Sequence, residues 1–236
     1  MQGAGAYQAV GKEAALAKAE DLKKAFGGVW RFAFFLCAAL TTAAGVLSIV
    51  CAVLSFLPPF DFVNFVFLTL FGLVMLLLDA PVENRYIVTF REMTHQYALF
   101  LTRFTGRGII YLFLGSMVFG SLWDNNISPF LGFIFAGIIA AVAIASLVFG
   151  YRMTMSLERV RQAVIAEGQD KWVAYIPAAG MSKAQFAEMA QALNRTVFTP
   201  EELTYIVGAF SFTYRADDVI SKEEFLEWCQ SPMTVL

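Results

Sequence analysis

Asp79 is the residue whose type and position could most readily support chemistry in this chain. It closes the apolar stretch LLLDAPVENRY, with Pro81 two positions later, and it is the only carboxylate that we place inside an apolar span. A carboxylate within a membrane segment is a candidate for a proton relay or an ion pathway. Such a pathway needs further polar groups, and Asn64 with a few threonines is too little to line one. We therefore expect a structural role, as a helix cap or as the partner of Arg107 in an ion pair.

The other residue types that carry chemistry are isolated along the sequence. His95 is the single histidine and lies in the amphipathic stretch EMTHQYALFLTRF, where we expect a solvated surface side chain. Cys37, Cys51 and Cys229 are too far apart for a metal motif and indicate no disulfide framework. No acid, base and nucleophile can be paired. The sequence therefore predicts a protein that is not an enzyme and that uses no cofactor.

Four apolar stretches must position Asp79 and Arg107. The chain has 236 residues, of which 58% are hydrophobic and only 15% charged, whereas about a quarter is usual in globular domains. A membrane-spanning helix needs about 20 mainly apolar residues. Stretches of about this length occupy residues 31–57, 60–80, 104–122 and 129–150. We predict an all-α integral membrane protein with a four-helix bundle over residues 29–150.

The distribution of positive charge predicts the orientation of these spans. None of the 17 Lys and Arg residues falls in the connections 58–61 or 123–128. Cytoplasmic segments of membrane proteins carry the excess of Lys and Arg, so both termini are predicted to be cytoplasmic. Arg103 and Arg107 would then meet anionic lipid headgroups. The glycosylation sequon at Asn126 lies in a very short loop, where we expect it to be unused. The net charge of −2 gives no indication of nucleic-acid binding.

The two ends of the chain are predicted to be cytoplasmic helical segments. Residues 1–28 form an amphipathic N-terminal segment, and residues 151–236 form a C-terminal domain in which MSKAQF and ISKEEF recur 39 positions apart. Each motif resembles the exit of a calcium-binding EF-hand loop. Calcium loops need carboxylates at their first and third positions and glycine at the sixth, and these are absent from the loop that would end at Glu224. We therefore predict a degenerate EF-hand pair that does not bind calcium. The weak metal candidates are Asp217, Asp218 and Glu224.

The central part of the chain resembles a known family. Asp79, Pro81 and the segment GRGIIYLFLGSM, which runs from Gly106 to Met117, are similar to the COPI-associated family of four-span Golgi membrane proteins. The resemblance covers about residues 28–150 and implies an endomembrane protein of vesicle traffic with no known chemistry. It also implies that the GRG segment is a structural hallmark. The residues to which we assign structural or interaction roles are Asp79, Arg103, Gly106, Arg107, Gly108 and Tyr111.

These observations favour a non-enzymatic scaffold or adaptor in vesicle-mediated transport. We expect it in Golgi or endosomal membranes, with the lipid bilayer and other membrane or coat proteins as partners and without nucleic acid. A small accessory subunit of a larger membrane complex, such as an ion channel or an energy-converting assembly, is the alternative. A channel or transporter would show flux that depends on Asp79.

Overall fold

A computed structural model of the chain describes residues 28–55, 58–81, 84–123, 125, 127–168, 171, 176–177, 180–211 and 219–230. The predictions for the N-terminal segment 1–27, for the sequon residue Asn126 and for Asp217 and Asp218 fall outside these residues.

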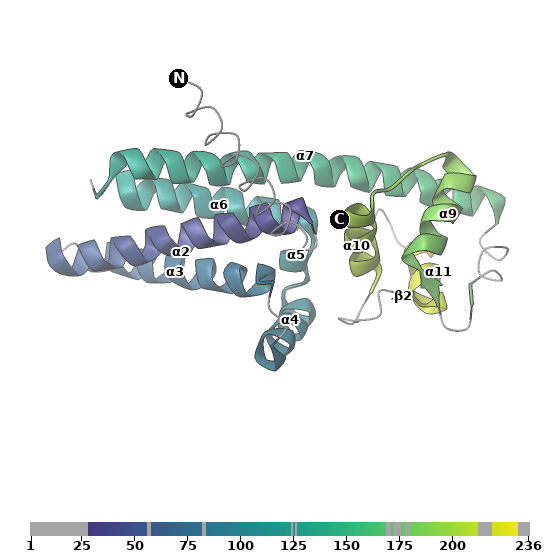
Figure 1. Cartoon of the computed structure of the whole chain (residues 1–236), viewed down its shortest axis with the longest axis horizontal. Coiled ribbons are helices and arrows are strands. Elements are labelled where there is room, and N and C mark those ends of the chain that lie inside the picture. Colours follow the sequence, from purple (N-terminus) through teal and green to yellow (C-terminus); the bar gives the residue numbers. More distant parts are fainter. Residues whose placement is uncertain are drawn as a thin grey trace, which may run out of the picture.

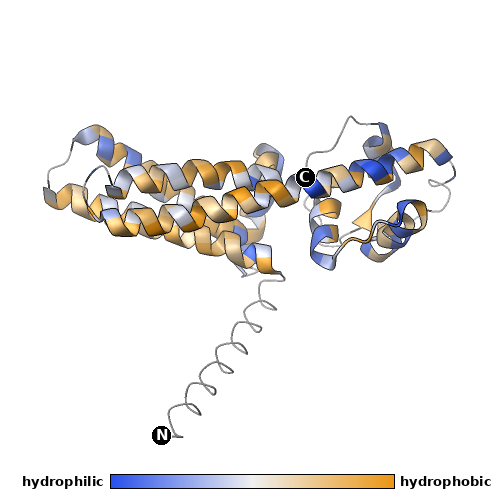
Figure 2. Ribbon diagram, turned by 90° about the horizontal axis from the view of Figure 1, so that it is seen from above, coloured by the Kyte–Doolittle hydropathy of each residue, from blue (hydrophilic) through white to orange (hydrophobic). Residues whose placement is uncertain are grey.

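Four long helices form the body of the protein (Figure 1). They are α2 (Val29–Ser55), α3 (Pro59–Asp79), α6 (Phe104–Trp123) and α7 (Pro129–Glu167), and each is long and apolar enough to cross a membrane. Figure 2 shows hydrophobic residues along the bundle and more hydrophilic ones beyond it. The chain is thus an all-α integral membrane protein, as predicted. Large side chains on the outside of the bundle that would face lipid include Leu54, Phe60, Phe130 and Phe133.

The bundle is built from two tightly packed helix pairs, α2 with α3 and α6 with α7. Helices in lipid associate where small residues let their backbones approach. Gly45 of α2 lies against the backbone of Thr69, and Gly72 of α3 lies against the backbone of Thr42. Both threonine hydroxyls donate to a carbonyl one turn earlier in their own helix, at 2.8 Å. By contrast, α3 and α6 approach each other only over a short stretch.

The prediction that Asp79 is the only carboxylate inside the spans is wrong. The helix begins at Pro59, so Asp61 lies in its first turn and is a second carboxylate within the spans. Proline at the first helical position and an acidic residue in the first turn both suit a helix N-terminus. The sequence PPFD is therefore the start of a helix as well as a connection.

The last long helix continues well beyond the bundle. With 39 residues, α7 is about 58 Å long, against a hydrocarbon thickness of about 30 Å. It passes through residue 150, where the sequence suggested the end of the membrane domain. Three short helices follow, which are α9 (Lys183–Asn194), α10 (Pro200–Phe210) and α11 (Lys222–Gln230), and α7 contacts α9 and α11. We call α9 to α11 and the two strands described next the C-terminal module.

The recurring motifs of the C-terminal module pair with each other. The strands β1 (Met181–Ser182) and β2 (Val219–Ile220) are antiparallel, with Met181 opposite Ile220. Helix α9 begins with a capping box of Ser182 and Gln185, and α10 begins with the predicted capping box of Thr199 and Glu202. The core beneath them is aromatic, with Phe210 at 4.9 Å and Phe186 at 5.9 Å from Trp228, measured between ring centroids.

Candidate functional site

The strongest concentration of buried polar groups lies where α3 ends and α6 begins. We call this the charged end of the bundle, and the short helices α4 (Arg85–Tyr97) and α5 (Leu99–Thr102) lie beside it. Asp79, the last residue of α3, is fully buried and forms an ion pair with Arg107 in the second turn of α6. The predicted pairing of these two residues is therefore present in the structure.

Both members of the ion pair have further partners. Arg107 Nε donates to the Leu101 carbonyl at 3.0 Å, and the Arg107 guanidinium lies 5.5 Å from the centroid of the Phe34 ring. The Tyr111 hydroxyl lies 3.3 Å from Asp79 Oδ2 and donates to the Phe34 carbonyl at 2.8 Å. Hydrogen bonds to the remaining polar atoms make a buried ion pair tolerable, and the Leu101 carbonyl supplies one to Arg107.

Two further arginines neutralise the end of α3. The carbonyl of Ala80, just beyond the helix, accepts hydrogen bonds from Arg31 Nη2 at 3.0 Å and from Arg91 Nη2. Cations are favourable near a helix C-terminus because the peptide dipoles leave partial negative charge there. Together with Arg107, these side chains offset both the dipole and the Asp79 carboxylate.

The GRG segment is explained by close packing around Arg107. A Cβ atom at Gly106 would overlap the Phe100 carbonyl, and one at Gly108 would lie 2.9 Å from Cγ of Leu147 in α7. Both glycines thus allow neighbouring segments to approach the start of α6. Arg103, which is half-buried between α5 and α6, accepts the backbone N–H of Arg107 at its carbonyl, at 3.0 Å.

Helix α10 of the C-terminal module covers the charged end and is held at three points. Glu201 Oε1, in its first turn, accepts the Trp30 backbone N–H at 2.9 Å and so caps the start of α2. The Tyr205 ring packs edge-on against Phe104, with 4.9 Å between centroids. The Ser211 carbonyl, directly after α10, lies 3.0 Å from Nε2 of His95. The contacts run along the whole length of α10, which therefore acts as a clamp between bundle and module.

This arrangement corrects the prediction for His95. Only 6% of the residue is exposed, because the face of α4 that carries it is covered by the C-terminal module. An amphipathic stretch indicates that one face will be buried, and here His95 belongs to that face.

Burial at the clamp also affects Tyr205. It raises the pKa of the Tyr205 phenol to about 12, although nearby Arg107 acts in the opposite direction. The phenol consequently stays neutral throughout the physiological range. A neutral aromatic ring is the form that packs well against Phe104.

The arrangement suits a structural role, in which the ion pair and the clamp hold the charged end together. Among the residues that the structure describes, no group of three or more His, Cys, Asp or Glu side chains could hold a metal ion. Glu224, a weak metal candidate from the sequence, is 4% exposed, and its Oε2 accepts from the Ser221 backbone at 2.8 Å and from Ser221 Oγ at 3.0 Å. This carboxylate thus caps α11.

Several residues of the clamp and of the charged end were not predicted from the sequence. Glu201 and Tyr205 lie in a capping-box helix whose pattern indicates a helix start but not what the helix covers. Arg31 and Arg91 were counted only as positive charges, and the Ala80 carbonyl that joins them carries no sequence signal. A helix C-terminus near three arginines could have suggested part of this cluster.

Comparison with known proteins gives one finding. A family model described as COPI associated protein matches residues 28–192. The match covers the four long helices, the residues of the ion pair and most of α9. Searches of curated proteins and of solved structures gave no match.

Proposed function

Because the chain belongs to the COPI-associated protein family, we propose that it is a non-enzymatic scaffold or adaptor in vesicle-mediated transport, resident in Golgi or endosomal membranes. In this proposal the charged end and both termini face the cytoplasm. The observation that carries it is the clamp, since α10 and the continuous helix α7 hold the C-terminal module in a fixed position against the membrane bundle. A module held in this way suits the display of a surface to soluble proteins.

The orientation is supported by the positions of charge in the structure. Arg31, Arg91 and Arg107 gather at the charged end, while the connections at the opposite end of the bundle carry no Lys or Arg. Accessibility of single cysteines placed at residue 58 and at residue 195 to a membrane-impermeant thiol reagent would test it. We expect label only at 195 when the reagent is supplied from the cytoplasmic side.

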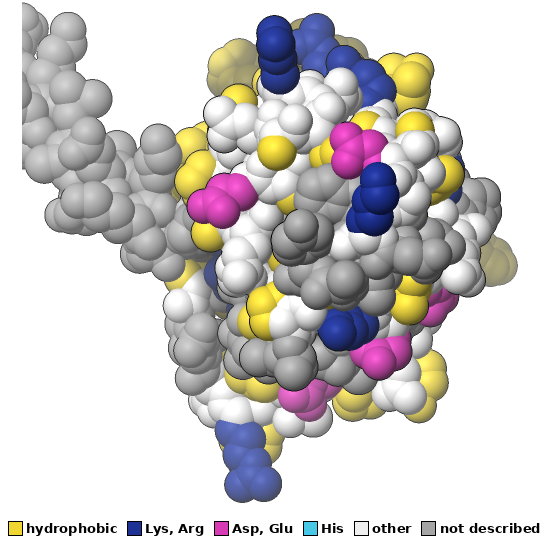
Figure 3. Space-filling model, turned by 90° about the vertical axis from the view of Figure 1, so that its right-hand side faces the viewer, with side chains coloured by type: hydrophobic (Ala, Val, Ile, Leu, Met, Phe, Trp, Pro, Cys, Tyr) yellow, Lys and Arg dark blue, Asp and Glu magenta, His cyan; other side chains and the backbone are white. Residues whose placement is uncertain are grey.

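The exposed surface of the module supports a role in reversible protein contacts. Figure 3, which views the molecule from the module side, shows Lys and Arg together with Asp and Glu on the same face. Exposed charges of the module include Glu188, Arg195, Glu223 and Glu227. Mixed polar surfaces of this kind are typical of the rims of non-obligate interfaces.

We also propose that the module is a degenerate EF-hand pair. Two helix-opening motifs joined by a short antiparallel strand pair support this assignment. Since Glu224 is already engaged in capping α11, millimolar calcium should leave the thermal unfolding temperature unchanged. A calcium-dependent rise would contradict the degenerate assignment.

A role without transport or catalysis is supported by the engagement of Asp79. Asp79 is fully buried and paired with Arg107, so it offers no open site to a moving ion. Flux measurements on reconstituted protein should therefore show no current or uptake that depends on Asp79.

The deciding experiment is purification of the tagged full-length protein in mild detergent, followed by mass spectrometry of the bound proteins. Coat or vesicle-tether components are expected. A fixed stoichiometric set of large membrane subunits would instead favour an accessory subunit of such a complex. The double variant Glu201→Ala/Tyr205→Ala should lose coat components, and Gly137→Ala in the membrane part of α7, where the added Cβ meets no neighbouring segment, should retain them.

A further inference from the structure

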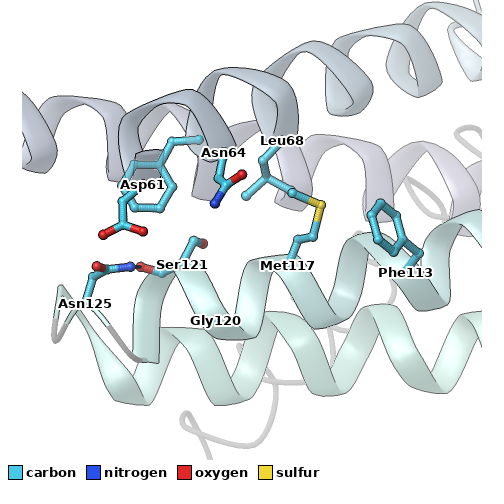
Figure 4. Close-up of a pocket in the computed structure, with 9 residues that line it drawn as sticks. Asp61, Asn64, Leu68, Phe113, Met117, Gly120, Ser121 and Asn125 are labelled. Carbon is cyan, nitrogen blue, oxygen red and sulfur yellow. Dashed lines mark hydrogen bonds between the residues drawn. The ribbon is translucent and has the colours of Figure 1, made fainter. Parts of the chain in front are cut away.

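A groove opens between α3 and α6 at the end of the bundle opposite the charged end (Figure 4). Its volume is about 520 Å³, within the range of about 300 to 1,000 Å³ that is typical of small-molecule sites. The groove exists because α3 and α6 belong to different helix pairs and approach each other only over a short stretch.

The lining of the groove changes from polar to apolar along its length. Asp61 and Asn64 of α3 face Ser121 and Asn125 across the outer part, and Leu68, Met117 and Phe113 line the inner part (Figure 4). This order matches an amphiphile, with a polar head at the outer part and an apolar chain further in.

In the part of the chain that the structure describes, the side chains of Asp61 and Asn64 have no internal partner. Within the described residues, no hydrogen bond or ion pair involves either side chain, although Asn125 donates to the Ser121 carbonyl at 3.3 Å. The two residues are three positions apart in the helix and so lie on one face. Asp61 is half-exposed and Asn64 is exposed.

The depth of Asn64 in the membrane makes its lack of a partner costly. Helix α3 has 21 residues, or about 31 Å, which equals the hydrocarbon thickness of about 30 Å. Asn64 lies five residues after the start of the helix, which is about 7 Å inside that boundary. A polar group in hydrocarbon costs free energy unless it finds a hydrogen-bonding partner.

Neither helix pair has a Lys or Arg residue in the part of its sequence that surrounds the groove. The segments 32–84 and 108–151 contain no Lys or Arg. These segments therefore supply no cation to the carboxylate, and the Asn64 amide beside it can donate to an anionic oxygen.

We propose that the groove binds a membrane phospholipid whose headgroup joins an ammonium group to a phosphate ester. The ammonium pairs with Asp61, the Asn64 amide donates to the phosphate, and an acyl chain lies along Leu68 and Met117. Phosphatidylethanolamine and phosphatidylcholine share this chemistry. Phosphatidylglycerol lacks the ammonium group and would bring its phosphate against an unneutralised Asp61. The inference does not depend on the adaptor role.

The test uses the full-length protein in nanodiscs that contain equal parts of dioleoyl phosphatidylethanolamine, phosphatidylcholine and phosphatidylglycerol. Lipid that stays bound after transfer to detergent is identified by native mass spectrometry. We expect the ammonium lipids to be retained and phosphatidylglycerol to be lost, and the ratio of the first two identifies the source of the headgroup. Asp61→Asn and Asn64→Leu should each reduce the retained lipid by about tenfold, as expected for a hydrogen bond to a charged group.

Two controls keep the result interpretable. Ser116→Ala on α6 lies outside the groove, and Glu92→Gln removes one exposed negative charge at the charged end; both should retain lipid as the wild type does. Unchanged thermal unfolding of each variant shows that the bundle is intact. Equal retention of phosphatidylglycerol, or retention unaffected by Asp61→Asn, would overturn the proposal. It would also be overturned by a dimer that Asn64→Leu dissociates, because the occupant would then be a second copy of the chain.

Discussion

At the charged end of the bundle, the Asp79 carboxylate is fully buried and is held by Arg107 and Tyr111 beneath a clamp formed by α10. At the opposite end, the Asp61 carboxylate is half-exposed in a groove, and no described side chain pairs with it. The two carboxylates lie in the last and the first turn of the same helix, α3.

The difference shows how one helix can have a structural end and a binding end. A buried polar group with all its partners inside the chain fixes the fold, because losing any partner leaves a charge uncompensated. A polar group in a groove that opens to the bilayer can instead take a partner from outside the chain. Sequence composition alone does not separate these cases, since both are single acids in apolar surroundings.

Breaking the ion pair should have the largest effect. Arg107→Leu leaves the Asp79 carboxylate buried without its cation, and removal of one partner of a buried pair costs about 3 to 5 kcal/mol. We expect a large fall in the thermal unfolding temperature in detergent, measured by fluorescence-detected size exclusion after heating. The double variant Asp79→Asn/Arg107→Leu should recover most of the loss. Equal instability of the double and single variants would show that Arg107 acts through something other than Asp79.

Substitution of the glycine after Arg107 should have the next largest effect. Gly108→Ala places a Cβ 2.5 Å from Oγ of Ser146 and 2.9 Å from Cγ of Leu147, and overpacking of this kind costs about 1 to 3 kcal/mol. Gly137→Ala in α7 is the matched control, because no atom of a neighbouring segment lies within 4 Å of the added Cβ. It should be neutral or slightly stabilising. The same heating assay compares the two, and equal effects would mean that α6 and α7 can shift apart without cost.

Loosening the clamp should have a smaller effect that is confined to α10 and the start of α2. Glu201→Ala removes the acceptor of the Trp30 N–H, and the loss of a helix cap costs about 1 kcal/mol. Hydrogen exchange should speed up at Trp30 and along α10, and it should stay unchanged in the α2–α3 contacts around Gly45. Glu188→Ala provides the control, and a similar change in that variant would argue against a specific clamp.

The clamp should also weaken at high pH through Tyr205. Its pKa is raised from the ordinary value of 10.0 to about 12, so the protonated form is favoured in the folded state. The corresponding stability is fully present below pH 10 and is lost as the pH rises through about 12. Amide hydrogen exchange along α10 should be corrected for the intrinsic pH dependence of exchange. The corrected rate should not depend on Tyr205 between pH 6 and 9 and should increase above pH 10. Tyr205→Phe should remove that increase and keep the packing against Phe104.

The four spans and the Asp79–Arg107 pair could be predicted from the sequence because their signals are local or follow from helix order. Apolar length fixes a span, and the alternating direction of successive spans places the end of α3 and the start of α6 on the same side of the membrane. The capping box at Thr199 and Glu202 could also be predicted, because it is a pattern of residues close together in the sequence.

The clamp and the groove could not be predicted because each depends on segments far apart in the chain. Glu201 caps a helix 171 positions earlier, and His95 is buried by residues 116 positions later. The groove depends on how far apart two helix pairs lie, which the pattern of apolar residues does not determine. The role of Asp61 was missed because PPFD has the composition of a turn.

The smallest expected effect on stability comes from making the same chemical change at the two ends. Asp79→Asn leaves Arg107 buried without its anion and should destabilise the bundle strongly. Asp61→Asn removes a charge that no described residue pairs with, so it should change the free energy of unfolding by less than about 0.5 kcal/mol in lipid-free detergent. Added phosphatidylethanolamine should then raise the unfolding temperature of the wild type and not that of Asp61→Asn, because a ligand stabilises only the folded state that binds it. A marked loss of stability in Asp61→Asn without lipid would mean that Asp61, like Asp79, has its partner inside the chain.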